Sequence, residues 1–479
     1  MFLFWLIPLL ALLGFFGLIL YRANRFTPKA QPKICEEQID FDRDSAVSAL
    51  QTLIRFKTVS YRNGALEDDA EFEKLIAALP GLYPSVMNTC ELKKLPDRAL
   101  LFRWRGKNEG APAVMMAHYD VVPIDEEGWE LPAFEGIIKD GCLWGRGALD
   151  TKVTFNGILF SADHLIAEGF TPEYDIYFAF SGGEEVNGRG AVHIVDYFKE
   201  QGIEPSLVLD EGGAVVRDVF PGVSEPCGLI GIAEKGMMDV RYTVHSSGGH
   251  ASAPKPNAPI DRLSRACTTV LKNPFPTHLS KPVVEMFDTL GRYSSFAYRV
   301  IFANINIFLP VLDVLCKKTG GELNALMRTT VAFTQMQGSD ASNVIPPSAS
   351  MVSNIRLNPE DTMDSALERL KKTINDDKVE VMYTHGMNPS RVSRTDCEGW
   401  DKIASAVAST WRGAIVSPYL MMQCSDSRHY GDISDRVYRF SAMDLTAEER
   451  VTIHGNNERI RIEAIHRTVE FYIRLMKSC

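Results

Sequence analysis

The stretch LWGRGALDTK, residues 143–152, is the segment around which the rest of this chain is organised. Two glycines, an arginine and a small residue crowd into the turn that leads to Asp150. An aspartate in such a turn can present both carboxylate oxygens outward, so that each oxygen contacts a different cation. A carboxylate that bridges two metal ions about 3.5–4 Å apart is the usual centre of a two-metal hydrolase. Because Gly-rich turns with an Asp are also common as plain turns, the prediction for Asp150 depends on the flanking segments.

The overall composition is that of an ordinary globular protein. The chain has 479 residues, 45% of them hydrophobic and 23% charged, which suits two or three domains. The net charge of -10 and the pI near 5.6 give no basic patch, so no nucleic-acid partner is expected. The nine cysteines are an odd number and form no CxxC pair. They predict reduced, buried thiols rather than a disulfide framework or a Cys-based zinc site.

The N-terminal residues 1–21 contain no charged side chain. Roughly 20 apolar residues are enough to span a bilayer. A cleaved signal peptide is the alternative, but the segment lacks a basic region before the apolar run and a clear small-x-small cleavage site after it. We therefore expect a single membrane anchor over residues 1–22, followed by a linker over residues 23–40. The positive-inside rule would keep the main body in the cytoplasm, although one short span leaves the side of the membrane open. The basic residues behind this orientation are Arg22, Arg25, Lys29 and Lys33.

Strands and helices alternate along the first half of the chain, which predicts an α/β domain with a mainly parallel sheet flanked by helices. Ligands of such sheets gather outside the carboxyl ends of the strands. Three of the apolar strands end in His/Asp, Glu/Glu and Asp/Glu, as a metal site requires. The expected strands are residues 100–106, 111–123, 173–185 and 205–213, and the expected helices are residues 41–56, 154–169 and 190–202.

The pattern changes near Ile232, after which residues 234–254 and 348–359 alternate in polarity like antiparallel strands. This change predicts an inserted α+β domain. Residues 283–315 within the insert are unusually apolar; a core helix pair is the favoured interpretation, and a greasy lid or acyl-chain surface is the functional alternative. The expected domains are a first catalytic part at residues 40–233, the insert at 234–357 and a second catalytic part at 358–479.

His118 and Asp120 lie two residues apart at the end of an expected strand, and side chains at this spacing share a face. Asp120 can therefore bond the ring nitrogen of His118 that a metal does not use, and so fix the tautomer. Of the adjacent pair Glu184 and Glu185, one can turn to the metal while the other acts as a general base toward the attacking water.

Two further residues complete the expected set. Asp210 ends the next strand, with the adjacent Glu211 interpreted as a supporting residue or as uninvolved, and His454 near the C-terminus supplies a second imidazole. Histidine and carboxylate ligands without a thiolate suit Zn²⁺, with Mn²⁺ or Co²⁺ as possible substitutes.

Nine motifs in this order and spacing resemble the M20 family of zinc peptidases, over essentially everything after residue 40. The segments at residues 126–136, 345–350 and 454–460 are most similar to the branch of the yeast-type Gly-X carboxypeptidase and the animal N-fatty-acyl-amino acid synthase/hydrolase. The motifs are AHYDVVP, GRGALDTK, GGEEV, LDEGG, SSGGHASAP, SNVIPP, NIRLNPEDT, SDSRHY and HGNNERI.

The resemblance implies a role for each matching residue. It implies one zinc ion held by His118, Asp150 and Asp210, and a second held by Asp150, Glu185 and His454. It further implies that Asp120 orients His118, that Glu184 is the general base, and that the peptide bond Asp150–Thr151 is cis. The insert would be a dimerisation domain whose His250 reaches the active site of a neighbouring subunit and stabilises the oxyanion. Asn343 and Arg356 would bind the substrate, Arg356 by clamping a terminal carboxylate.

Two departures from the family pattern remove no ligand; the first affects the support of Glu184, and the second concerns the substrate rather than the chemistry. Gly183 stands where the family often has Asp before the Glu pair, and Cys424 and Ser425 alter a substrate-facing loop. Arg428 in the same loop is retained, either to contact the substrate carboxylate or to form a structural ion pair with Asp426.

The function expected from the sequence is therefore hydrolysis of the amide bond of small dipeptides or N-acyl amino acids that have a free carboxylate, by a homodimer with two Zn²⁺ per subunit. The apolar segment and the anchor favour acyl or other hydrophobic substrates. One alternative is a catalytically inactive, membrane-associated binding protein of the same family. Another is a phosphoesterase that uses the same metals.

Overall fold

An eight-stranded sheet forms the centre of the catalytic domain in the computed structural model, which describes residues 2–479 and their side chains from Leu6 onward. The strand order is β1-β2-β6-β3-β7-β16-β8-β15, and the inner strands β6, β3, β7 and β16 run parallel. This arrangement confirms the predicted mainly parallel sheet. The strands are β1 (Glu91–Leu95), β2 (Ala99–Trp104), β3 (Ala113–His118), β6 (Ile176–Ser181), β7 (Leu207–Val216), β8 (Cys227–Glu234), β15 (Ile415–Met421) and β16 (Val437–Leu445).

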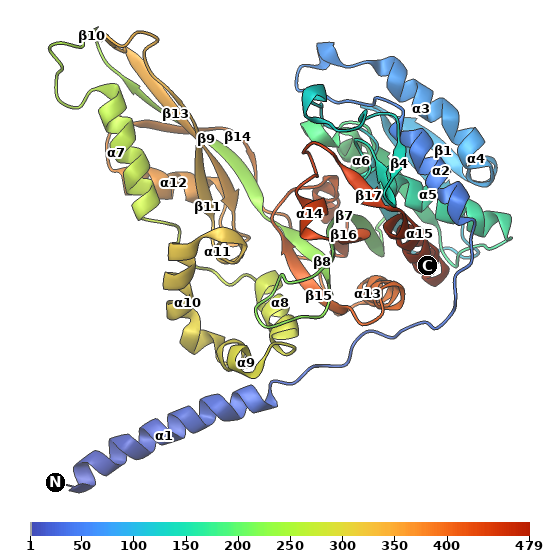
Figure 1. Cartoon of the computed structure of the whole chain (residues 1–479), viewed down its shortest axis with the longest axis horizontal. Helices are drawn as coiled ribbons and strands as arrows, with labels where there is room; N and C mark the ends of the chain where they lie inside the picture. The colour runs from blue at the N-terminus through green and yellow to red at the C-terminus, as the bar shows by residue number, and fades with distance from the viewer. Residues whose placement is uncertain (1) are drawn as a thin grey trace.

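Helices cover both faces of this sheet (Figure 1). The long, mostly buried helix α5 follows the Asp150 turn and packs with α15, α2 and α4 on one face, and α6 packs on the other. The helices of the domain are α2 (Arg43–Ile54), α3 (Asp69–Leu82), α4 (Pro84–Thr89), α5 (Lys152–Ala167), α6 (Gly190–Gln201), α13 (Glu398–Thr410), α14 (Ala447–Arg450) and α15 (Ile462–Ser478), with 3-10 turns η1 (Gly64–Leu66), η2 (Glu126–Gly128), η3 (Glu184–Val186) and η4 (Asp426–Asp432).

A small three-stranded sheet brings the C-terminal motif to the Asp150 turn. Its order is β17-β5-β4, with β4 (Ile137–Lys139), β5 (Cys142–Trp144) and β17 (Arg459–Arg461). The register pairs Arg459 with Trp144, just before the turn. Segments that lie about three hundred residues apart in the sequence are thereby held side by side.

The insert forms a separate antiparallel sheet, here called the lid, in the order β11-β13-β9-β14 with α7 and α12 packed on it (Figure 1). The lid extends further than expected: α12 and β14 lie beyond residue 357, where the sequence analysis placed the boundary, and β14 pairs with β9. Its elements are β9 (Gly236–His245), β10 (Gly249–His250), α7 (Pro259–Lys272), β11 (Thr330–Gln337), β12 (Val344–Ile345), β13 (Ser348–Leu357), α12 (Met363–Ile374) and β14 (Glu380–Met387).

The apolar segment at residues 283–315 divides between two environments. Helix α8 (Lys281–Gly291) packs on β15, with Val283 and Phe287 in the hydrophobic core of the catalytic domain. Helix α10 (Ile305–Thr319), in contrast, leaves much of its apolar surface exposed. The favoured prediction of a core helix pair is therefore right for α8 and wrong for α10. Between and after them lie α9 (Phe296–Phe302) and α11 (Gly321–Met327).

The N-terminal helix α1 (Phe2–Arg25) is long and apolar enough to cross a membrane over Leu6–Arg25. It ends three residues inside the predicted linker. A signal sequence would pass the same test, so the retained anchor stays a prediction. All nine cysteines are free thiols, but only four are buried, so the prediction of buried thiols is wrong for the exposed Cys35 and for the four cysteines of intermediate exposure.

Candidate metal centre

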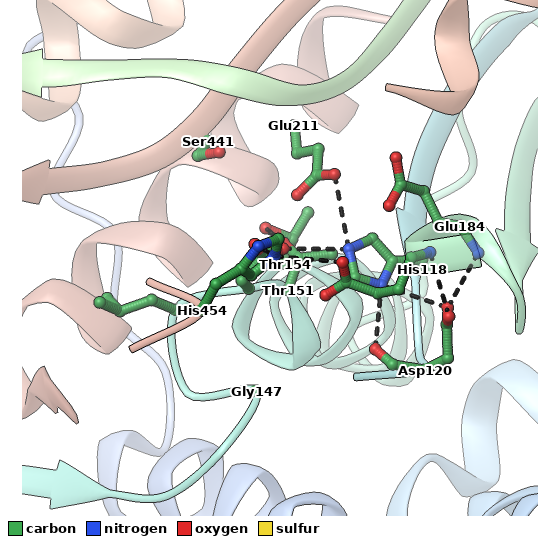
Figure 2. Close-up of polar contacts among 12 residues, drawn as sticks. His118, Asp120, Gly147, Thr151, Thr154, Glu184, Glu211, Ser441 and His454 are labelled. Carbon is green, nitrogen blue, oxygen red and sulfur yellow. Dashed lines mark hydrogen bonds and ion pairs between the residues drawn. The ribbon is translucent and has the colours of Figure 1, made fainter. Parts of the chain in front are cut away.

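The site begins at the carboxyl end of β3, where His118 and Asp120 lie next to each other (Figure 2). His118 is 2% exposed, and its Nδ1 lies 3.0 Å from the backbone oxygen of Asp120 and 3.3 Å from its Oδ1. These contacts fix the ring and leave Nε2 for the centre of the site. The carboxylate of Asp120 also accepts the backbone N–H groups of Glu184 and Glu185, each at 3.2 Å. Asp120 therefore connects the end of β3 to the segment that follows β6.

Asp150 lies between two histidines. Its Oδ1 is 3.0 Å from Nε2 of His118, and its Oδ2 is 3.0 Å from Nε2 of His454. Burial opposes ionisation, yet the hydrogen bonds from the two imidazoles hold the pKa of Asp150 far below its usual range. The peptide bond Asp150–Thr151 is cis, as expected. Each carboxylate oxygen thus faces a different histidine, which is the arrangement that a bridging ligand needs.

Glu458 holds the Asp150 turn in place, and the sequence analysis did not single it out. Its carboxylate is fully buried and accepts the backbone N–H groups of Gly147, Leu149 and Asp150 at 2.7–3.1 Å. It also pairs with buried Arg146 at 2.8 Å. Because Glu458 follows His454 by four residues, one short loop both supplies an imidazole and orients the carboxylate opposite it. The HGNNERI motif itself was the available signal.

The two glutamates after β6 take different positions. Oε2 of Glu185 lies 3.1 Å from Nε2 of His454, and its Oε1 is buried with no hydrogen-bond partner among the described residues. Glu184 projects toward the opposite side of the cluster, near His118 and Glu211 (Figure 2). Burial is the main cause that raises the pKa of Glu184 well above its usual value, and the charge of Glu211 adds to it. A raised pKa makes this carboxyl group hold a proton more readily, which suits a group that takes up a proton and returns it.

On β7 the predicted ligand Asp210 and its neighbour Glu211 take different directions. Side chains alternate along a strand, and Asp210 points away from the centre, where its Oδ2 accepts the backbone N–H of Ser427 at 2.9 Å. Glu211 points inward instead, with Oε1 3.4 Å from Nε2 of His118 (Figure 2). Burial and the negative charge of Asp150 raise the pKa of Glu211 to about 8. Glu211, interpreted from the sequence as supporting or uninvolved, is thus the β7 residue that groups with His118, and which of the two acids binds metal stays a prediction.

The donor set fits divalent cations. Two groups place their ligand atoms within 4.8 Å of one another: His118, Asp150 and Glu185 in one, and His118, Glu184 and Glu211 in the other. Buried carboxylates this close repel one another unless cations neutralise them, and the unpartnered Oε1 of Glu185 offers a free donor atom. Imidazole and carboxylate donors without a thiolate are those that Zn²⁺, Mn²⁺ and Co²⁺ accept.

The predicted substrate residues do not all gather at this centre. His250 and Asn343 are exposed together at the tip of the lid, where Ala251 N–H donates to the oxygen of Asn343 at 2.9 Å. Figure 1 shows β10, which carries His250, on the side of the lid away from the catalytic domain. Within one chain these two residues therefore lie apart from the metal cluster.

The two arginines lie nearer to the catalytic domain. Half-buried Arg356 has its Nη1 3.8 Å from the sulfur of Cys424. Arg428 lies 3.7 Å from the carboxylate of Glu234 and donates to the backbone oxygen of Asn388 at 2.7 Å. Arg428 thus pairs with Glu234 rather than with Asp426, and it holds the loop in place instead of facing the cluster.

A cavity of about 900 Å³ opens beside the carboxylate cluster. Asp150, Glu184, Glu185 and Glu211 line one end of it. Much of the rest is lined by apolar side chains from α8, α9, α11 and the strands beneath them, although the charged Asp218, Glu322 and Arg450 also line the cavity. The apolar side chains are Phe220, Leu229, Met286, Leu290, Tyr298, Leu323, Leu326 and Met443, and Cys424 lies on the same wall. The cavity therefore joins a cation-binding end to an apolar end.

Comparison with known proteins agrees with the resemblance drawn from the motifs. Residues 114–478 match the peptidase family M20/M25/M40. The chain is 33% identical to the probable carboxypeptidase S-like 2 of Dictyostelium discoideum, over 98% of this chain and 92% of that protein. It is 34% identical to the N-fatty-acyl-amino acid synthase/hydrolase of Xenopus tropicalis, over 92% of this chain and 87% of that protein.

Solved structures share the fold. An M20 family metallo-carboxypeptidase from Sulfolobus solfataricus has a TM-score of 0.65 at 18% identity and covers 90% of this chain and 98% of its own. A dinuclear metal binding peptidase from Bacillus subtilis has a TM-score of 0.56 at 13% identity, over 91% and 97%. With a family match over most of its length, the chain belongs to peptidase family M20 and is a hydrolase that acts on peptide or other amide bonds.

Proposed function

We propose that this protein is a dinuclear zinc amidohydrolase that releases an amino acid from an N-acyl amino acid, with small hydrophobic dipeptides as poorer substrates. The observation that carries the proposal is the cavity, because its acidic end meets an apolar wall large enough for an acyl chain. Relatives of comparable identity are named as a probable carboxypeptidase S-like protein and as an N-fatty-acyl-amino acid synthase/hydrolase, so we consider both substrate classes.

His118, Asp150 and Glu211 would hold one cation, and Asp150, Glu185 and His454 the other. When bound, two such cations polarise the amide carbonyl and make water nucleophilic at neutral pH. Glu184 takes the proton from the attacking water and returns it to the amine that leaves. Its backbone N–H is fixed by Asp120, and its raised pKa matches the two proton transfers.

Arg356 and His250 would bind two different groups of the substrate, namely its free carboxylate and the oxygen of the amide carbonyl. Arg356 contacts Cys424, which lines the cavity, and would pair with the free carboxylate of the amino acid. His250 is exposed at the tip of the lid, so we propose that a second copy of the chain brings it to this cluster and that Asn343 accompanies it. The protein would then work as a homodimer, with His250 donating to the oxyanion.

We also propose that α1 is retained as a membrane anchor rather than cleaved. Its last turns are packed on the body: Ile19 is 5% exposed and Ala23 is fully buried. The side-chain amide of Asn304 donates to the backbone oxygen of Ile19 at 3.2 Å. A signal peptide that is cleaved has no need to pack against the mature domain in this way.

The test uses the detergent-solubilised full chain and a series of N-acyl amino acids whose acyl chain grows from acetyl to palmitoyl, with matched dipeptides. Release of free amino acid should be abolished by a chelator and restored by Zn²⁺. Each methylene group that enters the apolar end should raise kcat/KM by about fourfold until the cavity is full. A flat profile along the series, or preference for polar dipeptides, would refute the acyl-chain assignment while leaving the metal chemistry intact.

Leu323 allows a matched variant. It is half-buried on α11 and lines the apolar end of the cavity. Leu323→Asn should lower kcat/KM for palmitoyl substrates by about 10- to 150-fold and leave acetyl substrates unchanged, because one side chain's burial is worth about 1.5–3 kcal/mol. Leu66→Asn, at an exposed leucine of the catalytic domain, is the control and should change neither value.

A further inference from the structure

Helix α10 carries an exposed apolar stripe. Ile307, Val311, Val314 and Leu315 are 38%, 65%, 66% and 52% exposed. Their spacing of four, seven and eight residues from Ile307 places all four on one face of the helix. Isolated exposed aliphatic residues are normal on a protein surface, but a continuous row of them along one helix marks a contact site.

The opposite side of α10 is tied to the protein, so the stripe cannot rotate inward. Cys316 is 2% exposed. Asp313 pairs with the buried Arg328 at 2.6 Å and with Lys317 at 2.7 Å. A rotation that buried the stripe would withdraw Asp313 from Arg328 and leave that guanidinium buried without its partner, which is strongly unfavourable. The outward direction of the stripe is therefore built into the fold.

The helix before it, α9, holds the end of the apolar helix α1. Ile19 and Ala23 of α1 are buried there, and Asn304 between α9 and α10 bonds the backbone of Ile19. The residues that follow α1 are also bound to the protein. The side chain of Arg292, just after α8, donates to the backbone oxygen of Thr27 at 3.0 Å and lies over the ring of Phe26. Figure 1 shows α1 running beneath α9 and α10. Any bilayer that α1 enters must therefore come close to these two helices.

We propose that α9 and α10 form a second, interfacial contact with the lipid bilayer, with the α10 stripe in the headgroup region beside α1. The two helices are apolar enough together to match a membrane span but bend by 101° between them, as an in-plane or re-entrant segment would. Basic side chains at the ends of α1 and α10 can extend to the lipid headgroups. They are Arg22, Arg25, Lys317 and Lys318. An amphipathic helix of this kind lies about 5–10 Å deep in the headgroup boundary.

The contact would place the apolar end of the catalytic cavity beside the bilayer. Tyr298 of α9, and Leu323 and Leu326 of α11, line that cavity, and these helices flank α10 on either side. The evidence for the membrane contact is the exposed apolar stripe of α10 and the packing of α1 on α9. The proposed contact does not depend on the proposed substrate.

The experiment places the full-length protein in lipid nanodiscs and attaches a polarity-sensitive fluorophore at Val314→Cys, with the exposed Cys35 replaced by Ser. Nitroxide-labelled lipids, with the spin label either near the headgroup or near the chain end, report depth by quenching. Leu13→Cys in α1 and Leu66→Cys in the catalytic domain are matched probes, being 59% and 62% exposed leucines. The parent protein without an introduced cysteine gives the labelling background.

We expect the probe at Val314 to be quenched more by the shallow spin label than by the deep one, and the probe at Leu66 by neither. The probe at Leu13 should prefer the deep label if α1 spans the bilayer. Quenching at Val314 no greater than at Leu66 would overturn the proposal, whatever α1 does. So would a probe at Val314 that is shielded from an aqueous quencher but untouched by the lipid labels, because a second protein copy would then cover the stripe. Val311→Cys repeats the measurement should labelling at Val314 disturb the helix.

Discussion

Replacing Glu458 with Gln should destabilise the protein far more than a change of one atom suggests. Glu458 is fully buried, and its two oxygens accept three backbone N–H groups of the Asp150 turn and pair with Arg146. Glutamine keeps one accepting oxygen and turns an NH₂ group toward donors. Arg146, 2% exposed, then keeps its bond to the oxygen of Gly455 but loses its counter-charge.

The loss of the counter-charge sets the magnitude. Removing one partner of a buried ion pair costs about 3–5 kcal/mol. Each backbone N–H that loses its acceptor adds about 1–3 kcal/mol where it stays unsatisfied. The lower bounds of these two costs, for the lost counter-charge and one unsatisfied N–H group, together give about 4 kcal/mol. Because the turn is short and can relax toward Gly455, we expect the free energy of unfolding to fall by about this amount. The charge of Arg146 should dominate this cost.

Urea denaturation of chelator-treated protein, followed by circular dichroism, measures the cost without a contribution from bound metal. Glu463→Gln is the control, since Glu463 is 58% exposed and should cost less than about 0.5 kcal/mol. In the double variant Glu458→Gln/Arg146→Met the unpaired charge is gone. The cost of the double variant should therefore be smaller than the sum of the two single-variant costs by about 2–3 kcal/mol. Additive costs, or a single-variant cost below about 1 kcal/mol, would refute the role given to this pair.

The remaining predictions concern the metal centre and the lid. Glu184→Gln should retain both metal ions, measured by elemental analysis, and lose about 10²–10⁴-fold in kcat; full activity would remove Glu184 as the base. Glu211→Ala should weaken metal binding by at least about tenfold, while Asp210→Asn, which keeps an acceptor for Ser427, should bind metal normally; the reverse pattern would restore Asp210 as the ligand. His250→Ala should leave metal content unchanged and lower kcat by about 10²–10³-fold. Mixing this variant with Glu184→Gln should recover activity only if dimers exchange subunits, because one subunit then supplies Glu184 and the other supplies His250.

Local pattern was enough to predict most of the α/β domain, because apolar runs and strand ends depend on a few neighbouring residues. It was not enough to choose between Asp210 and Glu211. Which of two adjacent acids faces the centre depends on the register of β7 against its neighbours, and a shift of one residue exchanges the two faces. That register comes from pairing with β3 and β16, which lie far away in the sequence.

Two other features were missed for the same kind of reason. Glu458 looks like one more polar residue in a loop, and only the pairing of β17 with β5 brings it under the Asp150 turn. The lid boundary was placed too early because α12 and β14 have patterns that either domain could use. Pairing of β14 with β9 assigns them to the lid, and this pairing is not visible in the local sequence.

The connection between the lid and the catalytic domain bears on how His250 could act. Only Lys235 separates β8 from β9, and its buried ammonium group donates to the backbone oxygens of Ala325 and Arg328 at 2.7 and 2.8 Å. At the same crossing, the N–H of Glu234 donates to the hydroxyl of Ser390 on the returning segment, at 2.8 Å.

A rotation of the lid large enough to carry His250 to its own metal cluster would break these buried bonds. Lost hydrogen bonds of a buried amine cost about 1–3 kcal/mol each. A second copy of the chain, in contrast, can present its lid without any change at this crossing. Helix α8 packs on β15 of the catalytic domain and forms part of the apolar wall of the cavity. The buried hydrogen bonds of the crossing therefore support the proposal that His250 is supplied in trans by a second copy of the chain.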